Sequence, residues 1–390
     1  MEVDDVLPEA DALNGECGFV DCYLIPFSQN YDEVHTPLSI FICIFGTVSN
    51  VINIVVLTRK RMRTPINILL TGLSIAQWLL AANYLAYLII EHYRMQCYDF
   101  LWSETMTWYR FFNVNLNVVF HTIAFITTIV VATFRYCALK YPIRANRYIY
   151  KTKLAVIANI VVWIVVPIIC IPVFLISEVK QIQPGEHTSC EITENMFDLN
   201  YQANPVLVST VFWMFGIVMK LIPSTLLTIL LAALIRSLKN VEKRRKNWKR
   251  THGQRCTSSE RKVKKKFASR PRTTRMLVIV LMLCVIVELP NGLLNLMTAI
   301  CGEEFGFRIY DHLGSLMEML TLLYSSVSFV LYCSMSNDFL TTFRLLFLPW
   351  YKPKDHFSTL VPASYYAANG CSASKPIPQD SPVDDGENLL

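Results

Sequence analysis

Two isolated charges stand inside long apolar stretches of this sequence, where a charge is costly unless it is paired. Lys220 lies in GIVMKLIPS, three residues before Pro223. Glu288 lies in VIVELPNG, two residues before Pro290. An acid and a base at similar depth offset each other's cost by forming an ion pair. We therefore predict an ion pair between two neighbouring helices, which is either a static staple or a contact that rearranges where the prolines bend the helices.

A stripe of polar side chains occupies another apolar stretch. Asn113, Asn117 and His121 recur every four residues, so on a helix they share one slowly turning face. Such a stripe indicates either the wall of a water-filled cavity or a satisfied network between helices. We favour the cavity, because five polar groups between residues 113 and 122 exceed what helix packing needs.

The elements that must position these residues are membrane-spanning helices. Hydrophobic residues make up 53% of the chain and charged residues 17%. A helix needs about 20 apolar residues to cross a bilayer. Seven stretches meet this requirement: Leu38–Thr58, Ile66–Ile90, Trp108–Ala132, Leu154–Ile176, Val206–Leu234, Met276–Ile300 and Leu313–Cys333. Because these runs are continuous rather than alternating, they predict an all-α bundle of seven transmembrane helices and exclude a β-barrel.

The charges in the connecting segments orient this bundle. The first 35 residues contain nine Asp and Glu and no Lys or Arg, whereas residues 239–275 contain sixteen Lys and Arg and two acids. Positive segments stay on the cytoplasmic side, so the N-terminus is expected outside and the C-terminus inside.

This orientation predicts four regions. Residues 1–37 form an acidic extracellular segment, and residues 38–334 form the seven-helix domain, with a basic third intracellular loop at about 239–275. Phe339, Phe343 and Phe347 recur at helical spacing, which predicts a short amphipathic helix on the membrane surface at residues 335–348. The tail, 349–390, is rich in Pro, Ser and Asp and is expected to be disordered.

Five cysteines fall on the oxidising outer side: Cys17, Cys22, Cys97, Cys190 and Cys301. Cys97 with Cys190 would join the first and second outer loops, and Cys17 with Cys22 is an alternative local bridge. Five is an odd number and sequence does not give the connectivity, so one or more free thiols remain an open alternative.

Several motifs resemble one receptor family. Asn50, Trp163 and an Arg-Tyr pair (Arg135, Tyr136) stand in the predicted helices as in the rhodopsin-like G-protein-coupled receptors. The strings FHTIAFITTIVVATFRYCALKYP, MKLIPSTLLT, RPRTTRML, VELPNGLLNL and SFVLYCSMSNDF are similar to invertebrate myosuppressin and FMRFamide-like peptide receptors, including their nematode branch. The likeness covers residues 38–348.

This resemblance implies a plasma-membrane, multi-pass receptor for an amidated Arg-Phe-amide-like neuropeptide. Its partners would be a heterotrimeric G protein, arrestin at a phosphorylated tail, and membrane lipid, with no cofactor, metal or nucleic acid. Glu91 and Glu318 would meet the arginine of the peptide, because both lie near outer helix ends. The other expected ligand contacts are Asn113, Asn117, His121 and Trp213. The expected activation and coupling residues are Arg135, Tyr136, Lys220, Pro223, Glu288, Pro290 and Tyr332.

The sequence also departs from the family pattern. Phe134 precedes Arg135 where most relatives have an acid, so a local lock on the resting state is missing and a raised basal activity is expected. Arg110 stands about where relatives have the cysteine that bridges to the second outer loop, so Cys190 needs another partner.

Other classes fit less well. A transporter or channel would be expected to show internal repeats with broken helices at matching positions, which we do not find. An enzyme is disfavoured because no His-Glu-x-x-His or comparable nucleophile set occurs. A light sensor needs a lysine in the stretch Leu313–Cys333, which has none. Within the receptor class, a chemoreceptor for a small environmental molecule is the alternative.

Overall fold

The structure is a computed structural model that describes residues 20–141, 151–182, 196–202, 204–251, 258–301 and 305–348. Two units divide the chain, Met1–Phe343 and Arg344–Leu390, and the first contains every spanning helix. The predicted tail at 349–390, residues 1–19 of the predicted N-terminal segment, and Cys17 and Cys190 lie outside the described residues.

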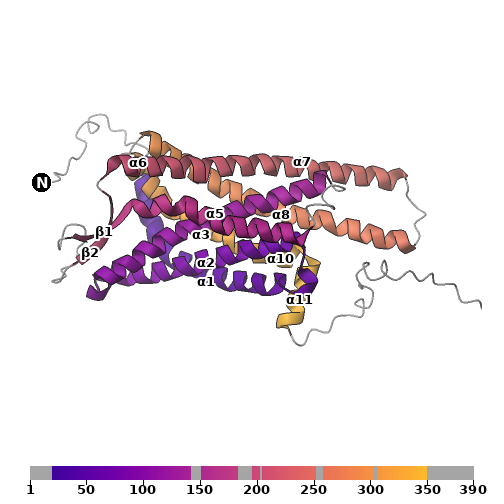
Figure 1. Cartoon of the computed structure of the whole chain (residues 1–390), viewed down its shortest axis with the longest axis horizontal. Helices are drawn as coiled ribbons and strands as arrows, with labels where there is room; N and C mark the ends of the chain where they lie inside the picture. The colour runs from indigo at the N-terminus through magenta and orange to yellow at the C-terminus, as the bar shows by residue number, and fades with distance from the viewer. Residues whose placement is uncertain are drawn as a thin grey trace, which may run out of the picture. The chain divides into compact units, whose positions relative to one another are not determined.

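Long helices make up the first unit, and they run side by side in Figure 1. The main helices are α1 (Ile25–Leu57), α2 (Pro65–Arg94), α3 (Glu104–Lys140), α5 (Thr152–Leu175), α6 (Pro205–Met214), α7 (Ile222–Thr251), α8 (Ser258–Cys301), α10 (Asp311–Met335) and α11 (Asn337–Phe347). Short helical turns are η1 (Val20–Leu24), η2 (Lys60–Met62), η3 (Asp99–Trp102), η4 (Phe215–Leu221) and η5 (Gly306–Tyr310).

Seven of the described helical segments are long and apolar enough to cross a membrane, with α6, η4 and α7 contributing to one of them. The predicted bundle of seven helices is therefore confirmed. Many apolar side chains of α5 are exposed, including Ile157, Ile160 and Ile164. Such a surface is stable in lipid, where exposed apolar groups carry no hydration cost.

The amphipathic helix predicted after the bundle is confirmed as α11. Ser336 caps it by accepting a hydrogen bond from the backbone N–H of Phe339 at 3.3 Å. Phe339 is buried and its ring contacts Tyr332 and Phe329 of α10. The part of α11 that belongs to the first unit is thus held against α10.

Three helices extend beyond the apolar stretches that predicted them. Helix α1 begins at Ile25, well before the predicted Leu38, because Pro26 suits the first helical turn and the polar residues that follow are helical without being apolar. Much of the predicted basic loop is helix, since α7 continues to Thr251 and α8 starts at Ser258. Figure 1 shows the extended ends of α7 and α8 projecting past the other helices, at the end of the bundle opposite to strands β1 (Ser177–Ile182) and β2 (Met196–Tyr201).

The helix that carries Lys220 is interrupted by η4, a π-helical segment. Pro223 has no N–H, so a carbonyl one turn earlier loses its helical donor, and a widened turn is one way to accommodate this. A π-helix thus lies just before Pro223, and Lys220 projects from that segment.

A two-stranded hairpin was not predicted. Strands β1 (Ser177–Ile182) and β2 (Met196–Tyr201) pair antiparallel between α5 and α6, with Lys180 opposite Asp198. Ile182 and Met196 are buried with Trp102 of η3. The hairpin therefore packs on the first outer loop rather than standing free.

Helices α2 and α5 cross closely at Gly72. Asn159 of α5 donates a hydrogen bond to the backbone carbonyl of Ile68 at 2.9 Å. A Cβ at position 72 would lie 2.5 Å from Asn159 Oδ1, so a side chain there must displace Asn159.

We expect Gly72→Ala to lower the stability of the purified protein by about 1–3 kcal/mol, the usual cost of overpacking. Thermal unfolding in detergent would measure it. The matched control is Gly72→Ala combined with Asn159→Ala, which frees the space that the new methyl group needs. If the double variant is no more stable than Gly72→Ala alone, this contact does not limit the helix crossing.

Candidate functional site

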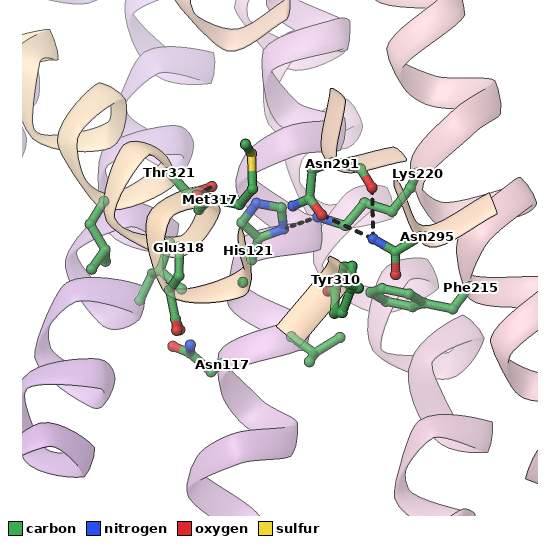
Figure 2. Close-up of a pocket in the computed structure, with 14 residues that line it drawn as sticks. Asn117, His121, Phe215, Lys220, Asn291, Asn295, Tyr310, Met317, Glu318 and Thr321 are labelled. Carbon is green, nitrogen blue, oxygen red and sulfur yellow. Dashed lines mark hydrogen bonds between the residues drawn. The ribbon is translucent and has the colours of Figure 1, made fainter. Parts of the chain in front are cut away.

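A cavity of about 290 Å³ lies between α3, η4, α8 and α10. Part of its wall comes from helix ends that lie on the extracellular side in the predicted topology. Asn295 is near the end of α8, and Gly314 is near the start of α10. The residues that line it are Leu80, Asn117, Val118, His121, Phe215, Lys220, Asn291, Asn295, Tyr310, Gly314, Met317, Glu318, Thr321 and Leu322. Figure 2 shows them arranged around this space.

The predicted ion pair forms at the cavity wall and is confirmed. Lys220 Nζ lies 3.2 Å from Glu288 Oε2. The Glu288 side chain has no exposed surface, whereas Lys220 lines the cavity. A carboxylate so deeply buried needs partners that satisfy both oxygens.

His121 and Tyr324 supply further partners for Glu288. His121 Nε2 is 2.9 Å from Glu288 Oε1, and Tyr324 Oη is 3.5 Å from the same oxygen. Lys220 Nζ is also 3.5 Å from His121 Nδ1. A lysine ammonium can only donate, so Nδ1 accepts and the imidazole proton is on Nε2, directed at Glu288. The Glu288 carboxylate therefore joins α3, η4, α8 and α10. We call Glu288, Lys220, His121 and Tyr324 the buried network.

Glu318 is the second acid of the site. It lines the cavity from α10, and Tyr84 of α2 lies within hydrogen-bonding contact of its carboxylate. Figure 2 shows its side chain pointing away from Lys220, toward the side of the cavity where Asn117 lies. Asn117 Oδ1 has no hydrogen-bond partner among the described residues. A carboxylate with no basic partner in the described part of the chain and an amide oxygen with no hydrogen-bond partner there therefore line the same side of the cavity.

Three predicted ligand contacts are placed elsewhere. Asn113 donates a hydrogen bond to the backbone carbonyl of Asn83 at 3.0 Å, so it joins α2 to α3 instead of lining the cavity. Glu91 is engaged by Arg94 and Arg110. Trp213 is 38% exposed and is not part of the cavity wall. Of the predicted polar stripe, Asn117 and His121 line the cavity and Asn113 does not. Residues four apart on a helix with 3.6 residues per turn do not point in the same direction, so the stripe rotates around α3.

Sequence reasoning missed several residues of the cavity wall. Asn291 and Asn295 are joined by a hydrogen bond from Asn295 Nδ2 to Asn291 Oδ1 at 2.9 Å. Their four-residue spacing in the string PNGLLN was a usable signal. Phe215 and Tyr310 could not have been selected from the many aromatic residues of the chain.

Three of the predicted coupling residues, Arg135, Tyr136 and Tyr332, lie toward the inner end of the bundle, whereas Pro290 lies near the cavity. Arg135 and Tyr332 line a small cavity of about 30 Å³ together with Leu277 and Phe339. Tyr136 accepts a hydrogen bond from Lys140 at 2.7 Å. Pro290 lies inside α8, two residues after Glu288, and is exposed. Arg135 and Tyr332 are therefore neighbours, as a shared coupling role would require.

The outer cysteines differ in state. Cys22 and Cys97 are disulfide-bonded, and Cys301 is a free thiol. The two predicted partners, Cys17 and Cys190, lie outside the described residues, so the pairing of Cys97 with Cys190 stays a prediction. Cys97 has a positive φ of 60°.

A bundle of seven spanning helices, with a polar cavity between them and an arginine at the other end, is the architecture of a seven-helix membrane receptor. The sequence pattern of the family described as "Serpentine type 7TM GPCR chemoreceptor Srw" matches residues 37–349. The chain belongs to this family. It is a G-protein-coupled receptor, a multi-pass protein of the plasma membrane, and not an enzyme.

Known receptors from worm, fly and bird are similar to it. The G-protein coupled receptor dmsr-1 of Caenorhabditis elegans is 29% identical over 356 residues, which cover 82% of this chain and 69% of that protein. The sex peptide receptor of Drosophila melanogaster is 25% identical over 346 residues, covering 85% and 75%. The thyrotropin-releasing hormone receptor of Gallus gallus is 24% identical over 336 residues, covering 82% and 80%.

Proposed function

We propose that this receptor binds an amidated, arginine-containing neuropeptide of the FMRFamide-like or myosuppressin-like kind and passes the signal to a heterotrimeric G protein. The observation that carries the proposal is Glu318, a carboxylate in the cavity wall without a basic partner among the described residues. The other acid, Glu288, is already neutralised by Lys220. A cationic ligand group therefore has one favourable position, and charge-assisted hydrogen bonds are the strong ones.

The cavity size fits the end of a peptide better than a whole peptide. About 290 Å³ is at the lower limit of ligand pockets, which are usually about 300–1,000 Å³. The cavity would hold the amidated end, and the rest of the peptide would lie across the outer loops. Asn117 lines the same cavity, and its Oδ1, which is buried without a partner among the described residues, would accept a hydrogen bond from the terminal carboxamide after a movement of the side chain.

The relatives support a peptide ligand without identifying it. The name of the Drosophila relative states that it is a receptor for sex peptide. The family description, chemoreceptor, favours the second candidate, a small environmental molecule. Either ligand would enter the same cavity, so the charge of Glu318 separates the two: a basic peptide needs it and a neutral molecule does not.

A screen of amidated peptides on cells that express this chain tests the proposal, with second-messenger concentration as the readout. We expect activation by at least one arginine-containing amidated peptide and a large loss of potency for its free-acid form. The control is the same peptide on cells without the receptor. Activation by neutral small molecules only, at verified surface expression, would replace the peptide hypothesis with the chemoreceptor one.

A further inference from the structure

Four charged side chains meet at the outer ends of α2 and α3, beside β2. Arg110 Nη1 donates a hydrogen bond to Asp198 Oδ1 at 2.8 Å, and Arg94 Nη2 lies 2.9 Å from the same oxygen. Glu91 is 3.2 Å from Arg94 Nη1 and 3.1 Å from Arg110 Nε. Two positive and two negative charges balance, and we call this group of four the ionic clasp.

The clasp is shielded from water. The side chains of Arg94 and Arg110 are 3% and 10% exposed, and those of Glu91 and Asp198 are 19% and 23% exposed. The guanidinium carbon of Arg94 is 3.5 Å from the ring centroid of Trp102. Screening by solvent is weak at such sites, so removing one charge leaves its partners uncompensated.

Asp198 is held in its charged form. Burial alone would raise the pKa of Asp198, but the hydrogen bond from Arg110, the charge of Arg94 and the backbone N–H of Leu199 together lower it below its ordinary value. A lowered pKa stabilises the fold at neutral pH, and this contribution is lost only as the pH falls through the folded-state pKa.

The clasp supplies the polar contacts that attach the hairpin to α2 and α3, beside the apolar contacts of the hairpin with Trp102. Asp198 is on β2, while Arg94 and Arg110 are on α2 and α3. Next to it, Thr107 donates a hydrogen bond to the backbone carbonyl of Phe197 at 3.0 Å. Strand β2 leads into α6, which continues into η4, where Phe215 and Lys220 line the cavity. The hairpin is therefore the element that precedes this part of the cavity wall in the chain.

We propose that the ionic clasp fixes the β1–β2 hairpin on α2 and α3. Arg110 and Asp198 act on the hairpin rather than on the ligand. Glu91 is part of this clasp, which explains why it is engaged before any ligand arrives.

Hydrogen exchange of the purified, ligand-free receptor tests this proposal through the amides of β1 and β2. Asp198→Asn leaves the clasp with a net charge of +1, and Arg110→Gln leaves −1. We expect each change to accelerate hairpin exchange by at least about tenfold, because removing one partner of a buried pair is strongly destabilising. The matched control is Glu178→Gln on β1, which removes an acid of the same hairpin outside the clasp.

The double variant, Asp198→Asn with Arg110→Gln, restores neutrality and keeps the Arg94–Glu91 pair. The fold-acceleration of hairpin exchange in the double variant should be clearly smaller than the product of the fold-accelerations in the two single variants. If a single variant does not reach the membrane, the double variant must still do so. Unchanged exchange in the single variants or additive effects in the double variant would overturn the proposal. Where a single variant fails to reach the membrane, a double variant that fails as well would also overturn it. None of these results depends on the identity of the ligand.

Discussion

Replacing Glu288 with leucine should lower the stability of the receptor by about 3–5 kcal/mol, the usual cost of removing one partner of a buried ion pair. The change leaves the Lys220 ammonium, which is 7% exposed, without its carboxylate. Lys220→Met should have an effect of similar size, because Glu288 has no exposed surface and would keep only His121 and Tyr324 as donors. Surface expression and thermal unfolding in detergent would measure both effects.

The double variant, Lys220→Met with Glu288→Leu, is the decisive comparison. It removes both charges together, so we expect it to recover most of the lost stability. Once surface expression shows that it folds, it also separates the static staple from the rearranging contact. If the pair holds the resting state, the double variant should show raised ligand-free G-protein turnover. Turnover equal to that of the unmodified receptor would make the pair a staple only.

Replacing Glu318 with glutamine should reduce the potency of the activating peptide by about tenfold to a hundredfold, since a hydrogen bond to a charged group contributes about 1.5–3 kcal/mol. The amide keeps the size of the side chain and removes only its charge. The control is Glu104→Gln, the same chemical change at an exposed position at the start of α3. Dose–response curves at matched surface expression would measure it, and equal potency in both variants would contradict a role for Glu318 in binding.

Local sequence features were sufficient to predict the bundle and its central ion pair. Each spanning helix is a continuous apolar run, a signal that does not depend on distant residues. Lys220 and Glu288 were recognisable as partners because each is the lone charge of its stretch, so the cost of burial left few alternatives.

The outer end of the molecule could not be predicted in the same way. Asp198 is one of several acids in its loop, and only the register of β2 selects it for Arg94 and Arg110. The hairpin depends on pairing between segments that are distant in the sequence, which has no local signature. Asn113 shows a related limit, because a small rotation of α3 decides whether its amide faces the cavity or Asn83.

The central claim is that Glu318 pairs with the arginine of the peptide ligand. A double-mutant cycle between receptor and ligand tests it most directly. An activating arginine-containing peptide and its citrulline analogue, which is neutral and of similar shape, would be measured on the unmodified receptor and on Glu318→Gln. We expect each single change to cost potency and the combined change to cost little more than either alone. If the two losses simply add, the peptide's arginine and Glu318 do not meet, and the carboxylate in this cavity serves another purpose.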